Sequence, residues 1–172
     1  MTNHKVAEDR DRADFLETLS THRSLLRRTV RDLTDEQARE RTTASELCLG
    51  GVIKHLTRVE KRWCDFIEAG PAAMGEGGAD MDAHAASFRM LEEDTLAGLL
   101  ESYEKACRRT DDLVASLGSL DDSQLLPSAP WYTPGASWSA RRVLLHVLAE
   151  TAQHAGHADI IRESLDGAKT MG

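Results

Sequence analysis

The chain has 172 residues, a formal net charge of −8, and 41% hydrophobic and 29% charged residues. This composition is typical of a globular domain that builds its core without disulfides. The acidic balance sets up no field that attracts phosphates, so we expect no nucleic-acid or anionic-membrane partner. No run of about 18 apolar residues occurs, and residues 1–12 are polar, which predicts neither a membrane span nor a signal peptide.

The three cysteines, Cys48, Cys64 and Cys107, lie far apart and have no C-x-x-C spacing. A disulfide framework or a zinc knuckle is therefore not expected. No neighbouring pattern activates one of these thiols as a nucleophile. Together with the polar amino end, the cysteine usage favours a cytoplasmic protein.

The first half of the chain predicts two long amphipathic helices. The first is expected over residues 7–33, where apolar side chains recur at three- and four-residue spacing and His22 falls among them. The run that begins at Thr34 (Thr-Asp-Glu-Gln) resembles a capping box and predicts a short helix. The second long helix is expected from near Ser45 to the Gly70-Pro71 stop.

The second half predicts two more helices and two connections. Residues 72–85 are rich in Gly and Ala and predict a loop, and a third helix is expected from Glu93 to Leu117-Gly118. Residues 119–138 hold three prolines and two tryptophans, which predicts a long irregular loop of a kind that usually serves a site. The fourth helix is expected from Ser137 or Ser139 to Asp166-Gly167.

No segment alternates as a strand would, so the sequence predicts an all-α four-helix bundle with a long loop before the last helix. We find neither an internal repeat nor a linker. The expected organisation is therefore a single domain over residues 1–172.

The fourth helix carries polar residues where a bundle helix should be apolar. On a wheel of about 100° per residue, Glu150 and His154 fall in the same arc as Val143 and Val147. Burying an ionised carboxylate is costly unless it is paired or binds a metal. The i, i+4 spacing projects both side chains from one face, so they are candidate metal ligands.

A third ligand has to come from another helix, and His55 qualifies at the edge of the apolar stripe between Val52 and Val59. Two histidines and one glutamate leave an open position, as in catalytic zinc sites, although Ni²⁺, Fe²⁺ or Mn²⁺ would suit the same set. Two interpretations without a metal stay open. In one, His55 is a core histidine. In the other, Glu150 and His154 form a buried ion pair.

Two stretches carry a resemblance to a known family. They are Gly50-Gly-Val-Ile-Lys-His55-Leu and His146-Val-Leu-Ala-Glu150-Thr-Ala-Gln-His154-Ala-Gly-His157-Ala-Asp-Ile-Ile-Arg162-Glu163. Over essentially its whole length the chain resembles the DinB-like superfamily of metalloproteins, which implies a bundle of up-down-down-up type. Many members use three histidines. The glutamate at position 150 is instead similar to the metal-binding domain of mycothiol-dependent maleylpyruvate isomerase, whose zinc ligands are His, Glu and His.

The resemblance implies that His55, Glu150 and His154 hold a divalent metal, zinc before Ni²⁺, Fe²⁺ or Mn²⁺. It also implies a low-molecular-weight thiol such as mycothiol as cosubstrate. That isomerase has an additional carboxyl-terminal domain, whereas this sequence ends just past the fourth helix. We therefore expect the activity of the single-domain thiol S-transferases. A coordinated thiol is deprotonated, and the thiolate would attack a small electrophile in a detoxifying reaction.

Two further histidines are candidate catalytic residues. His157, one turn from His154, would orient a ligand or move protons, or else lie at the solvent edge. His22 would approach the open side of the metal, or else be a core histidine bonded to a carbonyl. Asp159 and Arg162 point away from the ligand arc and are expected to be structural. The aromatic residues before the fourth helix are expected either to form a wall of the pocket or simply to pack. They are Trp131, Tyr132 and Trp138.

Two other functions stay open on the sequence. The first is metal-assisted hydrolysis, with His157 or His22 as the base because Glu150 would be a ligand. The second is a non-catalytic, stress-related bundle whose metal is structural or absent and which acts through a dimer interface. Pairing with a second copy of the chain is open under each interpretation.

Overall fold

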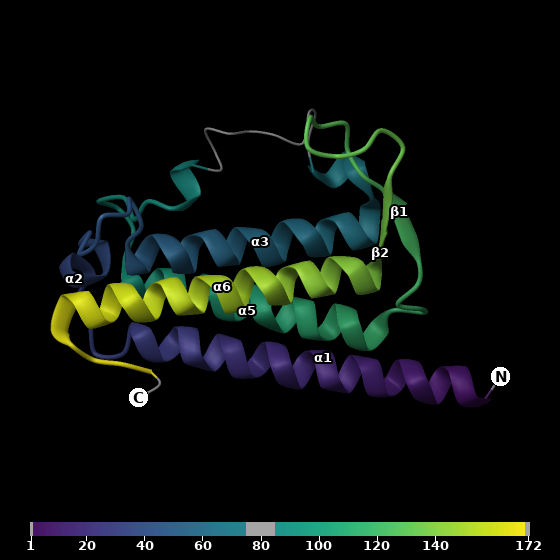
Figure 1. Ribbon diagram of the computed structural model, residues 1–172, viewed down its shortest axis with the longest axis horizontal. Coiled ribbons are helices and arrows are strands. Elements are labelled where there is room, and N and C mark those ends of the chain that lie inside the picture. Colours follow the sequence, from purple (N-terminus) through teal and green to yellow (C-terminus); the bar gives the residue numbers. More distant parts are fainter. Residues whose placement is uncertain (1, 75–84, 171–172) are drawn as a thin grey trace.

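Four long helices form a bundle in the computed structural model, which describes residues 2–74 and 85–170 (Figure 1). They are α1 (Thr2–Thr29), α3 (Leu49–Ala69), α5 (Leu96–Ser116) and α6 (Ala140–Asp166). Helices α1 and α6 run in one direction and α3 and α5 in the other. The predicted all-α fold and its up-down-down-up order are confirmed.

Side-chain packing holds the helices in the order α1, α6, α3, α5, since each packs extensively on the next. Helices α1 and α5 meet over a shorter stretch. The core around α3 and α5 includes Ile53, Leu56 and Tyr103, all fully buried. A second cluster joins Leu19, Trp63, Phe66, Val143 and Val147 from α1, α3 and α6. Helix α3 therefore lies at the centre of the molecule, with most of its residues buried.

Local sequence fixes several helix ends. The predicted capping box is present, since Thr34 accepts from the N–H of Gln37 at the start of the short helix α2 (Asp35–Arg39). Helix α1 ends at Thr29 rather than near residue 33, and α3 begins at Leu49 rather than near Ser45. The later start follows from the N-cap residue Cys48, whose sulfur accepts from the N–H of Gly51.

The expectation that no segment is a strand was wrong at one place. Strand β1 (Ser123–Leu125) pairs antiparallel with β2 (Ser137–Ser139), inside the predicted irregular stretch. Three-residue strands are too short for alternation to be read from sequence. Of the predicted loop at 72–85, the first residues belong to the 3₁₀ helix η1 (Pro71–Met74), and residues 75–84 lie outside the described part. No described helix is long and apolar enough to cross a membrane.

Candidate metal centre

Three side chains from α3 and α6 converge on a common point. They belong to His55, Glu150 and His154, and one ligand atom from each lies within 4.8 Å of the other two. Glu150 Oε2 is 3.6 Å from His55 Nε2 and also 3.6 Å from His154 Nε2. The fold thus brings together the three residues that the sequence predicted as ligands.

These separations suit metal ligands better than hydrogen bonds. At 3.6 Å the nitrogen–oxygen distances exceed the range of about 2.7–3.2 Å for N–H···O bonds. Ligands bound at about 2.0–2.1 Å in a tetrahedral shell lie roughly 3.4 Å apart. Two imidazoles with one carboxylate are also a known catalytic zinc set. The triad therefore fits a divalent metal without specifying which one.

The Glu150 carboxyl is held in the ionised state that a metal requires. His55 and His154 are buried, and about a quarter of the Glu150 side chain is exposed. The His154 and His55 side chains face the Glu150 carboxyl and hold its pKa well below the ordinary value. Metal ligands must be deprotonated before they bind. A carboxylate kept ionised over the whole physiological range meets that condition.

The second nitrogen of each liganding ring also has a partner. His55 Nδ1 lies 3.0 Å from Ser87 Oγ, and His154 Nδ1 lies 3.3 Å from His157 Nδ1. Phe88 stacks on the His55 ring, with centroids 3.8 Å apart and planes inclined by 16°. Contacts of this kind fix the tautomer and orientation of a liganding histidine. They leave both Nε2 atoms directed toward Glu150.

Two glycines at the start of α3 allow the Ser87 segment to approach. A Cβ on Gly51 would lie 1.9 Å from the backbone oxygen of Phe88, which cannot rotate away. A Cβ on Gly50 would lie 2.2 Å from Met90 Sδ. The Gly-Gly of the first motif therefore lets Ser87 and Phe88 lie against His55. Ser87 and Phe88 could not be identified from the sequence. Nothing in the local pattern indicates that Ser87 meets His55, which lies 32 positions away.

The other predicted residues have different surroundings. His157 contacts His154 itself, so its position suits orienting a ligand. His22 is half-buried on α1, and no hydrogen bond or ring contact of the described residues joins it to the triad. Its catalytic role stays a prediction. Arg162 is structural as predicted, since its guanidinium donates to Thr29 O and Arg31 O at 2.9 Å and so holds the end of α1.

His146, one turn before Glu150, extends the site along α6. Its Nε2 lies 3.8 Å from Glu150 Oε1, and its ring meets the edges of Trp63 and Trp138 with centroids 4.9 and 5.5 Å apart. Burial lowers the pKa of His146, against the opposing effect of the Glu150 charge. The neutral imidazole is therefore favoured at this position. Of the three predicted aromatic wall residues, Trp138 lies directly beside the site.

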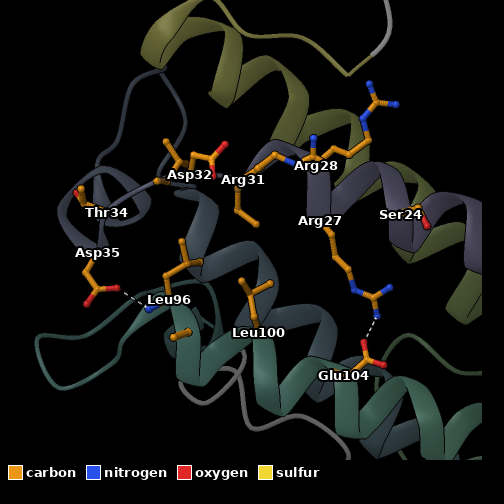
Figure 2. A pocket seen from close by; sticks show the side chains of 13 residues that line it. Ser24, Arg27, Arg28, Arg31, Asp32, Thr34, Asp35, Leu96, Leu100 and Glu104 are labelled. Atoms are coloured by element: carbon orange, nitrogen blue, oxygen red, sulfur yellow. Dashed lines mark hydrogen bonds and ion pairs between the residues drawn. The ribbon is translucent and has the colours of Figure 1, made fainter.

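A separate pocket of about 1000 Å³ lies between α1 and α5, the two helices that contribute nothing to the triad (Figure 2). Some of its charged side chains bind one another or the backbone. Arg27 donates to Glu104 at 2.6 Å, and Asp35 accepts from the N–H of Leu96 at 2.7 Å. None of the predicted site residues lines this pocket.

Comparison with known proteins identifies a family and a similar fold. A family model described as mycothiol-S-transferase matches residues 14–167. No curated protein matches the chain. A conserved protein from Enterococcus faecalis, known from its crystal structure, is similar with a TM-score of 0.66 over 90% of this chain and 96% of that chain. Its sequence identity is 14%, so this likeness supports the fold alone.

Proposed function

Because the chain belongs to the mycothiol S-transferase family, which is DinB-like, we propose that it transfers a low-molecular-weight thiol such as mycothiol to a small electrophile. The metal ligands in this proposal are His55, Glu150 and His154. The observation that carries it is the convergence of their ligand atoms, in which the Glu150 oxygen lies 3.6 Å from each imidazole nitrogen, too far for a hydrogen bond. The most suitable ion is Zn²⁺, with Ni²⁺, Fe²⁺ or Mn²⁺ as alternatives.

A divalent metal, when bound, supplies Lewis acidity that lowers the pKa of a thiol to which it is coordinated. The residues set the charge that favours this reaction. Two imidazoles would add no charge to a bound divalent ion and the Glu150 carboxylate would add one negative charge, so the site would keep a net positive charge that favours a thiolate. His146 and His157 adjoin the ligands and are the candidates to take up the thiol proton. The sulfur then forms a bond to the electrophilic carbon, whose leaving group departs with its electron pair.

The types of the ligands support a catalytic centre over a structural one. Structural zinc sites are built mostly from cysteine, with or without histidine, whereas two histidines and one glutamate form a catalytic set. Among the described residues, the cluster that could hold an ion has these three members. No observation favours hydrolysis over thiol transfer, and the family match names a thiol.

The test is metal analysis of the purified protein beside two variants, His154→Ala and the matched control Gln153→Ala, whose side chain is exposed on the same helix turn. We expect about one equivalent of metal in the wild type and the control, and none in His154→Ala. Only the metal-loaded proteins should conjugate mycothiol to an electrophile such as bromobimane. Metal-free wild type, even after reconstitution, would overturn the proposal. Turnover that survives complete metal removal would also do so.

A further inference from the structure

The tip of the β1–β2 hairpin presents an exposed aromatic side chain. Trp131 is 53% exposed, although tryptophan is highly buried on average. Two turn hydrogen bonds order this tip, from Tyr132 N to Ala129 O at 3.1 Å and from Ala136 N to Thr133 O at 3.0 Å. These bonds order the backbone of the tip, and the hairpin lies at the bundle end where α6 begins (Figure 1).

A continuous series of ring contacts connects this tip to the triad. The Trp131 and Tyr132 centroids are 6.1 Å apart, and those of Tyr132 and Trp138 are 5.9 Å apart. Trp138 in turn lies 5.5 Å from His146, which adjoins Glu150. We call Trp131, Tyr132, Trp138 and His146 the aromatic strip. It begins at the candidate metal centre and ends in solvent.

Arg142 adds hydrogen-bond donors to the aromatic strip. Its guanidinium lies 4.3 Å from the centroid of the Trp138 ring, which itself stacks on Trp63 at 5.1 Å and 16°. In the part of the chain that the structure describes, the exposed Arg142 side chain makes no hydrogen bond or ion pair, so its donors are available to a ligand. Arg142, His146 and Glu150 follow at four-residue spacing and share one helix face. Arg142 lies about 12 Å along the axis from Glu150.

We propose that Trp131 and Tyr132, at the solvent end of the aromatic strip, and Arg142 bind the glycan of the thiol cosubstrate while its sulfur lies at the triad. This inference rests on the proposed function. Mycothiol joins a cysteine thiol to a polyhydroxylated glycan, so its two ends need different surroundings. Indole faces pack against the apolar C–H faces of sugar rings, and a guanidinium donates to hydroxyl oxygens. The separation of Arg142 from Glu150, about 12 Å, suits a ligand whose thiol and glycan lie at opposite ends.

The first test compares mycothiol with N-acetylcysteine, which has the thiol but lacks the glycan. For Trp131→Ala we expect the ratio of kcat/KM for mycothiol to that for N-acetylcysteine to fall about three- to tenfold. Arg142→Gln should lower the same ratio. The matched control is Leu125→Ala, on β1 of the same hairpin and 60% exposed, and it should leave the ratio unchanged. Equal losses for both thiols in Trp131→Ala would overturn the inference.

The second test separates this inference from the proposed function, because it needs neither a metal nor turnover. Calorimetry would measure binding of the glycan without its cysteine, to protein as purified and to protein treated with a chelator. We expect binding to both forms, weakened about three- to tenfold by Trp131→Ala and not by Leu125→Ala. Absence of glycan binding would overturn the inference even if thiol transfer is observed. Glycan binding without any thiol turnover would overturn only the proposed function.

Discussion

Two polar clusters interrupt the apolar core, and they are built in opposite ways. Between α1, α3 and α5, Arg23 donates to both carboxylate oxygens of Glu60 at 2.9 and 2.5 Å, and Thr110 donates to the same carboxylate at 2.6 Å. Between α3 and α6, the Glu150 carboxylate lies 3.6 Å from both liganding histidines. The first cluster satisfies its charges internally, whereas the second gathers ligand atoms around one point.

The difference shows that a buried charge is not by itself evidence of a site. Glu60 is completely buried and Arg23 is 3% exposed, and Glu60 raises the pKa of that guanidinium against the effect of burial. Nevertheless their hydrogen bonds leave little capacity for a ligand. Glu150 is more exposed, and its neighbours lie at ligand distances. Partner distances, rather than burial, therefore separate a structural ion pair from a candidate metal centre.

The largest effect on stability is expected from Glu60→Ala. Removal of the carboxylate leaves the buried Arg23 charge with only the half-exposed Asp111 as an anionic partner, which should lower the free energy of unfolding by about 3–5 kcal/mol. The matched control is Glu104→Ala, which breaks the half-exposed Arg27–Glu104 pair and should cost at most about 1 kcal/mol. Urea unfolding measures both. Equal losses of unfolding free energy in the two variants would contradict the contrast between the two clusters. If Glu60→Ala does not fold, Glu60→Gln, which keeps the side-chain volume, takes its place.

For Glu150→Gln we expect the larger effect on metal binding rather than on stability. The amide lacks the anionic ligand, so metal titration should show a marked loss of affinity. In metal-free protein the same change should lower the free energy of unfolding by less than Glu60→Ala does, because the partly exposed carboxylate lies 3.6 Å from its histidines instead of in short hydrogen bonds. A loss as large as that of Glu60→Ala in the presence of a chelator would instead identify Glu150 as a structural ion-pair member, like Glu60.

A smaller loss of metal affinity is expected from Ser87→Ala, which removes the hydroxyl beside His55 Nδ1. Contacts of this kind typically contribute about 10- to 100-fold in affinity, and competition with a chromophoric chelator would measure the change. Ser164→Ala is the control, because this exposed hydroxyl donates only to Ile160 O on its own helix. Unchanged affinity in Ser87→Ala would show that packing alone orients the His55 ring.

The smallest change is expected for the cysteines, which should not react in the native state. Burial raises the pKa of Cys64 to about 11 and that of Cys107 to about 12, where Glu60 acts in the same direction. At about pH 8, Ellman's reagent should find all three thiols protected until denaturant is added. The stabilisation by the protonated thiols of Cys64 and Cys107 is complete below their unfolded pKa of about 8.5 and is lost as pH rises toward 11–12. Rapid native labelling would contradict this.

Much of the candidate centre could be predicted because its elements are local. Glu150 and His154 lie four residues apart on one helix, so their convergence follows from helix geometry alone. His55 lies on another helix, and sequence could nominate it only through its residue type and its position on a stripe. The cluster of Arg23 and Glu60 was not predicted. Polar residues at single positions of two different helices give no periodic pattern that reveals a partner.

The sequence by itself determined the four amphipathic helices, the capping box at Thr34 and the Glu150–His154 pair, because each depends on residues within a few turns of one another. Only the tertiary structure decided the contacts between distant segments. Ser87 meets His55 across 32 positions, and Arg23 meets Glu60 across 37. Such contacts depend on how whole helices and connections pack. Periodicity gives the face that a helix buries but not the residue it meets there.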